Sequence, residues 1–230
     1  MAPATCPQLS VVIPVRNEAN RLPTLLAALN TAAGLVADVL VVDGGSSDAS
    51  RTIAQLAGAR LLRSGGGRGA QLAAGAGAAS GSWLLLLHGD ATLPEGWDQA
   101  VRRAMRRGCG AWYFELAIAD AHPVLRLMEL AVGWRSRWHQ LPYGDQGLLL
   151  PAELLQRCGG IRPLPLMEDL ELIERLHRHT RLRSLGLALR VDGRRWRRLG
   201  VWRTALENAR LRRQWRRGIS AEQLARAYYR

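Results

Sequence analysis

Cysteine is scarce in this 230-residue chain, and lysine is absent. The three cysteines, Cys6, Cys109 and Cys158, are odd in number and far apart. This spacing argues against a disulfide scaffold or a zinc cluster and favours a reducing, cytoplasmic setting. We attribute the absence of lysine, beside 32 arginines, to genome composition rather than to chemistry.

Long apolar runs and targeting signals are also missing. No window approaches the ~18 uninterrupted apolar residues of a membrane span, and the first residues lack the three regions of a signal peptide. Because 48% of the residues are apolar, we do not expect a disordered chain. The length suits one soluble α/β domain, attached at most peripherally to the inner face of a membrane.

Charge is concentrated near the C-terminal end. Residues 181–230 contain 15 arginines and three acidic residues, a net charge of +12 out of +13 for the whole chain. We therefore expect residues 1–193 to form the catalytic domain and residues 194–230 to form a basic helical extension packed on it.

The first 90 residues alternate apolar strands with helices. This alternation predicts right-handed crossovers and a mainly parallel sheet flanked by helices. The expected strands are 9–15, 38–42, 59–63, 83–87, 111–118, 147–150 and 183–191. The expected helices are 18–33, 47–56, 69–80, 93–105, 123–137, 168–179, 200–216 and 221–229.

Polar and acidic residues follow three of the apolar strands. They are Asn17 and Glu18, Asp43, and His88 with Asp90. Ligands of open α/β sheets bind at the carboxyl ends of the strands, so these groups should meet at one crevice. Asp43 either accepts a hydrogen bond from a nucleobase or caps the turn at Ser46–Asp48.

Asp90 ends a strand of four leucines and needs a partner there. A divalent metal that bridges a diphosphate would supply one, because Mg²⁺ binds one or two carboxylates together with phosphate oxygens. His88 is either a second ligand or a structural hydrogen-bonding residue.

Three further segments carry candidate residues. The glycine-rich run 64–71 lies between a strand and a helix, where backbone amides and Arg68 can receive an anion, although such turns more often serve packing. Glu168 and Asp169 either stabilise a helix N-terminus or act in catalysis. Asp145 lies in a segment, 142–147, that reads most simply as a turn.

Taken in order, these segments resemble glycosyltransferase family 2, whose members have the GT-A fold. The resemblance covers roughly residues 9–190. Within the family, the segments 87–94, 142–147, 165–169 and 194–198 look like the subgroup called rSAM/selenodomain-associated transferase 2, also known as arsenosugar biosynthesis glycosyltransferase.

The resemblance implies an inverting, hexosyltransferase-like enzyme that uses a UDP- or GDP-class sugar donor, an unknown hydroxyl acceptor, and Mn²⁺ or Mg²⁺. Asp169, the second acid of the family's E-D motif, would be the general base, with Glu168 beside it. His88 stands where the D-x-D motif has its first acid, and Asp90 matches its last. The implied sites are nucleotide binding by Pro14, Asn17, Glu18, Asp43, Arg68, Gly69, Gln71 and Gly89, metal binding by Asp90 and His88, and acceptor binding by Asp145 and Gln146.

Other functions remain open at this point. A nucleotidyltransferase shares the fold, but its first turn normally carries glycines and a basic residue, whereas here it is Arg16-Asn17-Glu18. A non-catalytic sugar-nucleotide-binding relative is a second alternative. The basic segment 194–217 would be a solvated helix face, a surface that binds anionic membranes or, ranked last, a nucleic-acid-binding surface.

Overall fold

The computed structural model describes residues 8–32, 34–120, 122–194 and 200–228. Cys6, most of the predicted 194–198 motif and the last residue of the predicted 221–229 helix lie outside these ranges. None of the described helices is both long and apolar enough to cross a bilayer.

Seven strands form one sheet in the order β3-β2-β1-β4-β6-β5-β7. All pairings are parallel except those of β6, which runs antiparallel to β4 and β5. The predicted α/β fold with a mainly parallel sheet is thereby confirmed. The strands are β1 (Leu9–Val15), β2 (Val36–Asp43), β3 (Arg60–Arg63), β4 (Trp83–Leu86), β5 (Ala111–Ala119), β6 (Leu148–Pro151) and β7 (Leu182–Asp192).

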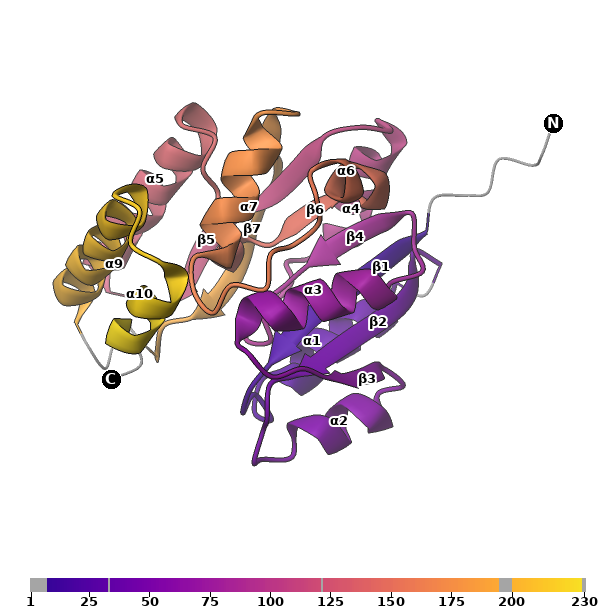
Figure 1. Cartoon of the computed structure of the whole chain (residues 1–230). Coiled ribbons are helices and arrows are strands. Elements are labelled where there is room, and N and C mark those ends of the chain that lie inside the picture. Colours follow the sequence, from indigo (N-terminus) through magenta and orange to yellow (C-terminus); the bar gives the residue numbers. More distant parts are fainter. Residues whose placement is uncertain (1–7, 33, 121, 195–199, 229–230) are drawn as a thin grey trace.

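Helices cover both faces of the sheet (Figure 1). One core cluster combines α1 (Leu22–Asn30), α2 (Ser50–Leu56) and α4 (Trp97–Arg106) with residues such as Val11 and Ile13 of β1. The other combines α3 (Arg68–Ala78), α6 (Ala152–Arg157) and α7 (Glu168–His177) with Val12 and Leu84. Alternate residues of the buried strands thus face opposite helix layers.

Three helices lie at one end of the sheet, on the left of Figure 1. They are α5 (Pro123–Trp138), α9 (Val201–Arg216) and α10 (Ala221–Tyr228). Leu211 of α9 and Leu224 of α10 form a cluster with Leu166, just before α7. The basic C-terminal helices are therefore packed onto the segment that leads to Glu168 and Asp169.

The first two helices begin later than their sequence patterns predict. Residues 18–21 precede α1, because the amides of Glu18 and Ala19 donate to the side chains of Ser50 and Asp48 instead of lying in a helix. Asp48 also accepts from the Ser50 amide, so α2 begins at Ser50 and not at residue 47. The short helix α6 was not predicted, because its six residues directly follow β6 without a turn signal.

Candidate functional site at the carboxyl edge of the sheet

The strand directions bring six segments to one edge of the sheet. Because only β6 runs against the others, the carboxyl ends of β1, β2, β4 and β7 share this edge with the segment that precedes β6. Asp43 ends β2, Asp90 follows β4, and Asp192 ends β7. The first turn of α7 supplies Asp169 to the same cavity.

The loops after β1 and β2 are fastened together by polar contacts. The Asn17 amide donates to Ser46 Oγ at 3.0 Å, and Asn17 Oδ1 accepts from the Ser47 amide at 2.8 Å. Asp43 is buried, and its carboxylate accepts from the amides of Gly45 and Ser46 at 3.1–3.2 Å. Asp43 therefore caps its own turn, one of its two predicted roles, and its contact with a nucleobase stays a prediction.

Gln71, Gly69 and Gly89 serve close packing in this structure. The Gln71 amide nitrogen donates to the carbonyls of Val15 and Val42 at 3.0 and 2.6 Å, which joins the ends of β1 and β2. A Cβ on Gly69 would lie 2.3 Å from the Leu164 carbonyl oxygen. A Cβ on Gly89 would lie 3.1 Å from Val15 and 3.4 Å from the Pro14 carbonyl oxygen. These residues shape the nucleotide-binding region that we predicted, and the side chain of Gln71 is fully used in doing so.

Arg68 is held over the first turn of α7. Its Nε is paired with the buried carboxylate of Glu168, its Nη2 lies 3.7 Å from Asp169 Oδ2, and its Nη1 lies 3.2 Å from His88 Nε2. Burial raises the pKa of Glu168, although the Arg68 charge opposes that shift. Glu168 thus positions Arg68 and does not reach the cavity, so we assign it a positioning role in place of the catalytic one.

His88 is bound to the same guanidinium. Burial, followed by the Arg68 charge, lowers the pKa of His88 to about 3, so the ring is neutral. Because a guanidinium only donates, Nε2 is the acceptor and the proton lies on Nδ1. The lone pair of Nε2 is then used by Arg68, and this geometry does not support the predicted role of His88 as a metal ligand.

Asp169 lies in the wall of the cavity as an ionised carboxylate. Its Oδ2 accepts from the Gly144 amide at 3.0 Å, and its Oδ1 accepts from the Leu170 amide at 2.8 Å. Burial by itself would raise the pKa of Asp169, but the Arg68 charge and these two amides outweigh it and lower the pKa. Asp169 is therefore ready to accept a proton at neutral pH.

A second group of charges surrounds Asp90. Arg194 bridges Glu18 and Asp192, with Nη2 2.9 Å from Glu18 Oε1 and Nε 2.6 Å from Asp192 Oδ2, and Arg21 also pairs with Asp192. Burial raises the pKa of both Glu18 and Asp90.

Asp90 is suited to a divalent cation that is shared with a ligand. Within the described residues Asp90 has no ion-pair partner within 4.0 Å, and no three His, Cys, Asp or Glu side chains form a metal cluster. A desolvated carboxylate without a counter-ion fits Mg²⁺ or Mn²⁺, provided that most other ligands come from a bound diphosphate and water. The donor set therefore fits a metal held with substrate, not a closed structural site.

The segment before β6 contains the two predicted acceptor residues. Asp145 lines the cavity, burial raises its pKa, and its buried Oδ1 has no hydrogen-bond partner in the described structure. Gln146 is fully buried, donating to the Phe114 carbonyl and accepting from Ser136 Oγ. Asp145 is thus available to a ligand, whereas Gln146 holds the segment in place and does not face an acceptor.

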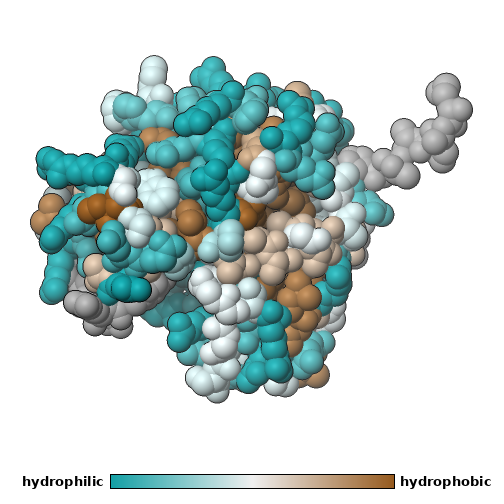
Figure 2. All heavy atoms as spheres, viewed as in Figure 1, coloured by the Kyte–Doolittle hydropathy of each residue, from teal (hydrophilic) through white to brown (hydrophobic). Residues whose placement is uncertain are grey.

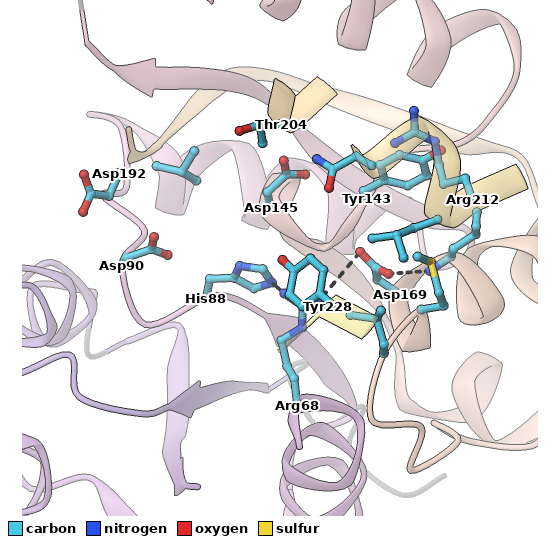
Figure 3. A pocket seen from close by; sticks show the side chains of 16 residues that line it. Arg68, His88, Asp90, Tyr143, Asp145, Asp169, Asp192, Thr204, Arg212 and Tyr228 are labelled. Carbon is cyan, nitrogen blue, oxygen red and sulfur yellow. Dashed lines mark hydrogen bonds and ion pairs between the residues drawn. The ribbon is translucent and has the colours of Figure 1, made fainter. Parts of the chain in front are cut away.

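Sequence reasoning missed the side of the cavity formed by the last helices (Figure 3). The cavity has a volume of about 280 Å³, and Thr204, Asn208 and Arg212 of α9 and Tyr228 of α10 line it. Tyr143 completes this wall, with the Arg135 and Arg212 guanidinium carbons 3.7 and 5.5 Å from its ring centre. Asp192 could have been found, because it ends an apolar strand as Asp43 does. The helix residues carried no comparable signal.

An open α/β sheet with acidic strand ends around one cavity defines a ligand-binding crevice protein. The family model described as glycosyl transferase family 2 matches residues 10–151, more than half of the chain, and the chain belongs to that family.

Solved structures of glycosyltransferases share this fold. A glucosyl-3-phosphoglycerate synthase from Mycobacterium tuberculosis, in complex with Mn²⁺, UDP and phosphoglyceric acid, has a TM-score of 0.58 and 20% identity over 79% of this chain and 69% of that one. TarS from S. aureus, residues 1–349, has a TM-score of 0.65 and 15% identity over 81% of this chain and 60% of that one. A search of curated proteins found no match.

Proposed function

We propose that this chain transfers a sugar from a nucleoside-diphosphate donor to an acceptor hydroxyl with inversion, and that Asp169 is the general base. The observation that carries the proposal is the state of Asp169. It is ionised, it is fixed by the Gly144 amide, and it lines the cavity that also contains Asp90. Figure 3 shows the two carboxylates on either side of His88.

The reaction needs one proton acceptor and stabilisation of one leaving group. Asp169 takes the proton from the acceptor hydroxyl while its oxygen forms a bond to the anomeric carbon. The bond from that carbon to the diphosphate oxygen breaks on the opposite face, which inverts the anomeric centre. Arg68 lines the cavity and offers positive charge to the departing diphosphate.

Mn²⁺ or Mg²⁺ is the cofactor that we propose, with Asp90 as its protein ligand. The mycobacterial synthase was solved with Mn²⁺ and UDP and also with Mg²⁺ and UDP. A bound divalent ion would neutralise charge on the leaving diphosphate.

The donor is proposed to be a UDP- or GDP-class hexose, since the mycobacterial synthase was also solved with UDP-glucose. The motifs at 87–94, 142–147 and 165–169 support placement in the rSAM/selenodomain-associated transferase 2 subgroup. We place the protein in the cytoplasm on the basis of its cysteine content.

Calorimetry with UDP-, GDP- and dTDP-sugars, with and without Mn²⁺ or Mg²⁺, tests the donor site. We expect one nucleotide class to bind in a metal-dependent way, and Asp90→Ala to weaken that binding. The exposed Glu95→Gln is the matched control and should bind as the wild type does. Absence of binding by every nucleotide would contradict the proposal.

Turnover by Asp169→Asn tests the base. We expect unchanged donor binding and transfer slower by about 10²–10⁴-fold, the usual contribution of general-base catalysis. NMR of the product should show an inverted anomeric configuration. Donor binding without any transfer by the wild type would instead indicate a non-catalytic sugar-nucleotide-binding relative.

A further inference from the structure

Large hydrophobic side chains are exposed almost exclusively on two helices. Of the seven such side chains in the described residues, four lie on α5 and two on α9, and the seventh is Leu56 on α2. The six are Leu127, Leu130, Trp134, Trp138, Trp202 and Leu206, each between 59% and 75% exposed. We call them the α5–α9 face.

The spacing of these residues places them on one side of each helix. On α5 they follow at intervals of three, four and four residues, and on α9 at an interval of four, which is the period of a single helix face. The two helices are neighbours, because Arg135 of α5 and Arg212 of α9 both approach the ring of Tyr143. Figure 2 shows apolar side chains among hydrophilic ones at the left of the molecule, where Figure 1 places α5 and α9.

The charge around the α5–α9 face is positive. Arg126 and Arg137 of α5 and Arg203, Arg210 and Arg213 of α9 are exposed. The acidic residues of these two helices, Glu129 and Glu207, are not in the exposed class, and Glu129 is paired with Arg126. The whole chain carries +13, so a second copy would bring like charge against like.

From this combination we propose that the α5–α9 face docks on an anionic lipid bilayer. Tryptophan is favoured at the interface of a bilayer, and a helix lying in that plane buries its apolar face by ~5–10 Å. The 16 residues of α5 span about 24 Å. The leucines and tryptophans would enter the interface, and the surrounding arginines would contact anionic head groups.

The orientation that follows keeps the cavity beside the lipid surface. Thr204, Asn208 and Arg212 line the cavity from α9, whereas Trp202 and Leu206 of the same helix are exposed. Docking through the exposed side therefore leaves the inner side of α9 facing the cavity.

Co-sedimentation of the full chain with lipid vesicles tests the proposal. We expect binding to vesicles of phosphatidylcholine and phosphatidylglycerol in equal parts, and at least tenfold weaker binding to phosphatidylcholine alone. Trp134→Ser with Trp138→Ser should weaken binding to the mixed vesicles at least tenfold and reduce quenching of tryptophan fluorescence by brominated lipids. All these side chains are exposed, so folding should be retained, which circular dichroism checks.

The matched control is Leu56→Ser, which removes an exposed leucine (84% exposed) from α2 and should leave vesicle binding unchanged. Asp169→Asn should also bind vesicles normally, so failure of the catalytic proposal would not affect this result.

Three outcomes would overturn the proposal. They are equal binding to both kinds of vesicle, no vesicle binding with a concentration-dependent dimer in light scattering, and no vesicle binding with salt-sensitive binding to nucleic acid. The dimer would make the α5–α9 face a contact between copies, and the third result would make the arginines a phosphate-backbone surface.

Discussion

Gly144 lies between His88 and Asp169 with almost no room for a side chain. A Cβ there would lie 3.0 Å from His88 Nε2 and 3.2 Å from Asp169 Oδ2. The Gly144 amide also donates to Asp169, so the same residue both orients the carboxylate and allows its close approach. Precise placement of a base contributes strongly to rate, and this makes Gly144 a sensitive position.

Gly144→Ala should therefore lower kcat about 10–100-fold while donor binding changes little. The added methyl group displaces Asp169 from its position without touching the region of Asp43. Gly77→Ala, a helical glycine of α3 with open space around it, is the control and should leave kcat unchanged. Steady-state kinetics together with nucleotide calorimetry would check both variants, and unchanged kcat in Gly144→Ala would argue against Asp169 as the base.

The pH dependence of kcat depends on the ionisation of Asp169 and His88. The pKa of Asp169 lies below its ordinary value of 3.8, and the pKa of His88 is about 3. The carboxylate loses its function only as pH falls through its lowered pKa, and the imidazole stays neutral above pH 4. With saturating donor and metal, kcat should be level from pH 5 to pH 7 on the acid side. An acid limb with its midpoint near 6.5 would mean that a histidine titrates in catalysis.

At the scale of elements, the ends of β1 and β2 are joined by one side chain. The Gln71 amide reaches from α3 to the carbonyls of Val15 and Val42, and Gly44 packs directly against it. This contact sets the distance between the two loops that carry Asn17 and Asp43. The shape of the predicted nucleotide site thus depends on a residue that does not face it.

Gln71→Leu keeps the volume but removes both hydrogen bonds, so the free energy of unfolding should fall by about 1–3 kcal/mol. Urea denaturation followed by circular dichroism would measure the change. Gln55→Leu on the exposed side of α2 provides a comparison and should cost much less. Equal effects in the two variants would show that the buried amide contacts contribute nothing.

The last helix, α10, closes one side of the cavity with Tyr228. This ring lies near His88 and Arg68 in Figure 3, on the side of Asp169. A tyrosine in this place excludes water from the region of the proposed base.

Tyr228→Ala should raise the hydrolysis of the sugar donor severalfold, because water would then reach the anomeric carbon beside Asp169. Release of nucleoside diphosphate without acceptor would measure it. Tyr113→Phe, which removes only a hydroxyl from a buried ring in β5, provides the comparison. A fall in hydrolysis in Tyr228→Ala would mean that the ring positions the donor instead of excluding water.

The elements differed in how far their sequence determined them. The buried strands and α7 followed from their apolar periodicity, because a strand between two helix layers leaves few alternatives. Asp43, Asp90 and Asp169 followed from the strand-end and helix-start patterns. Tyr143, Arg212 and Tyr228 did not, since their place in the cavity depends on how α9 and α10 pack against Leu166. His88 and Gln146 were placed correctly in the chain, but their partners, Arg68 and Ser136, depend on tertiary packing.

At the scale of the whole molecule, Arg194 connects the first loop of the fold with the last strand. It bridges Glu18 and Asp192, which are more than 170 residues apart in the chain. Without it, two partly desolvated carboxylates beside Asp90 would lose their shared counter-ion.

Arg194→Gln should therefore reduce the free energy of unfolding by about 1–3 kcal/mol, as expected for charge-assisted hydrogen bonds that are partly exposed. The loss should shrink at high ionic strength, which screens the repulsion among the acids. Arg203→Gln on the exposed side of α9 should have no such effect. Thermal unfolding at low and high salt would separate the two variants, and a loss independent of salt would argue for packing in place of charge.

The position of β7 also has a consequence for protein synthesis. While a ribosome has made only residues 1–181, β5 is an edge strand on one side, and its backbone groups are open to pairing with another chain. At that moment Glu18 still lacks Arg194, and the α9 wall of the cavity has not been made. A nascent chain of this length is thus both inactive and prone to aggregation, and donor turnover reports on how many chains have completed synthesis and folding.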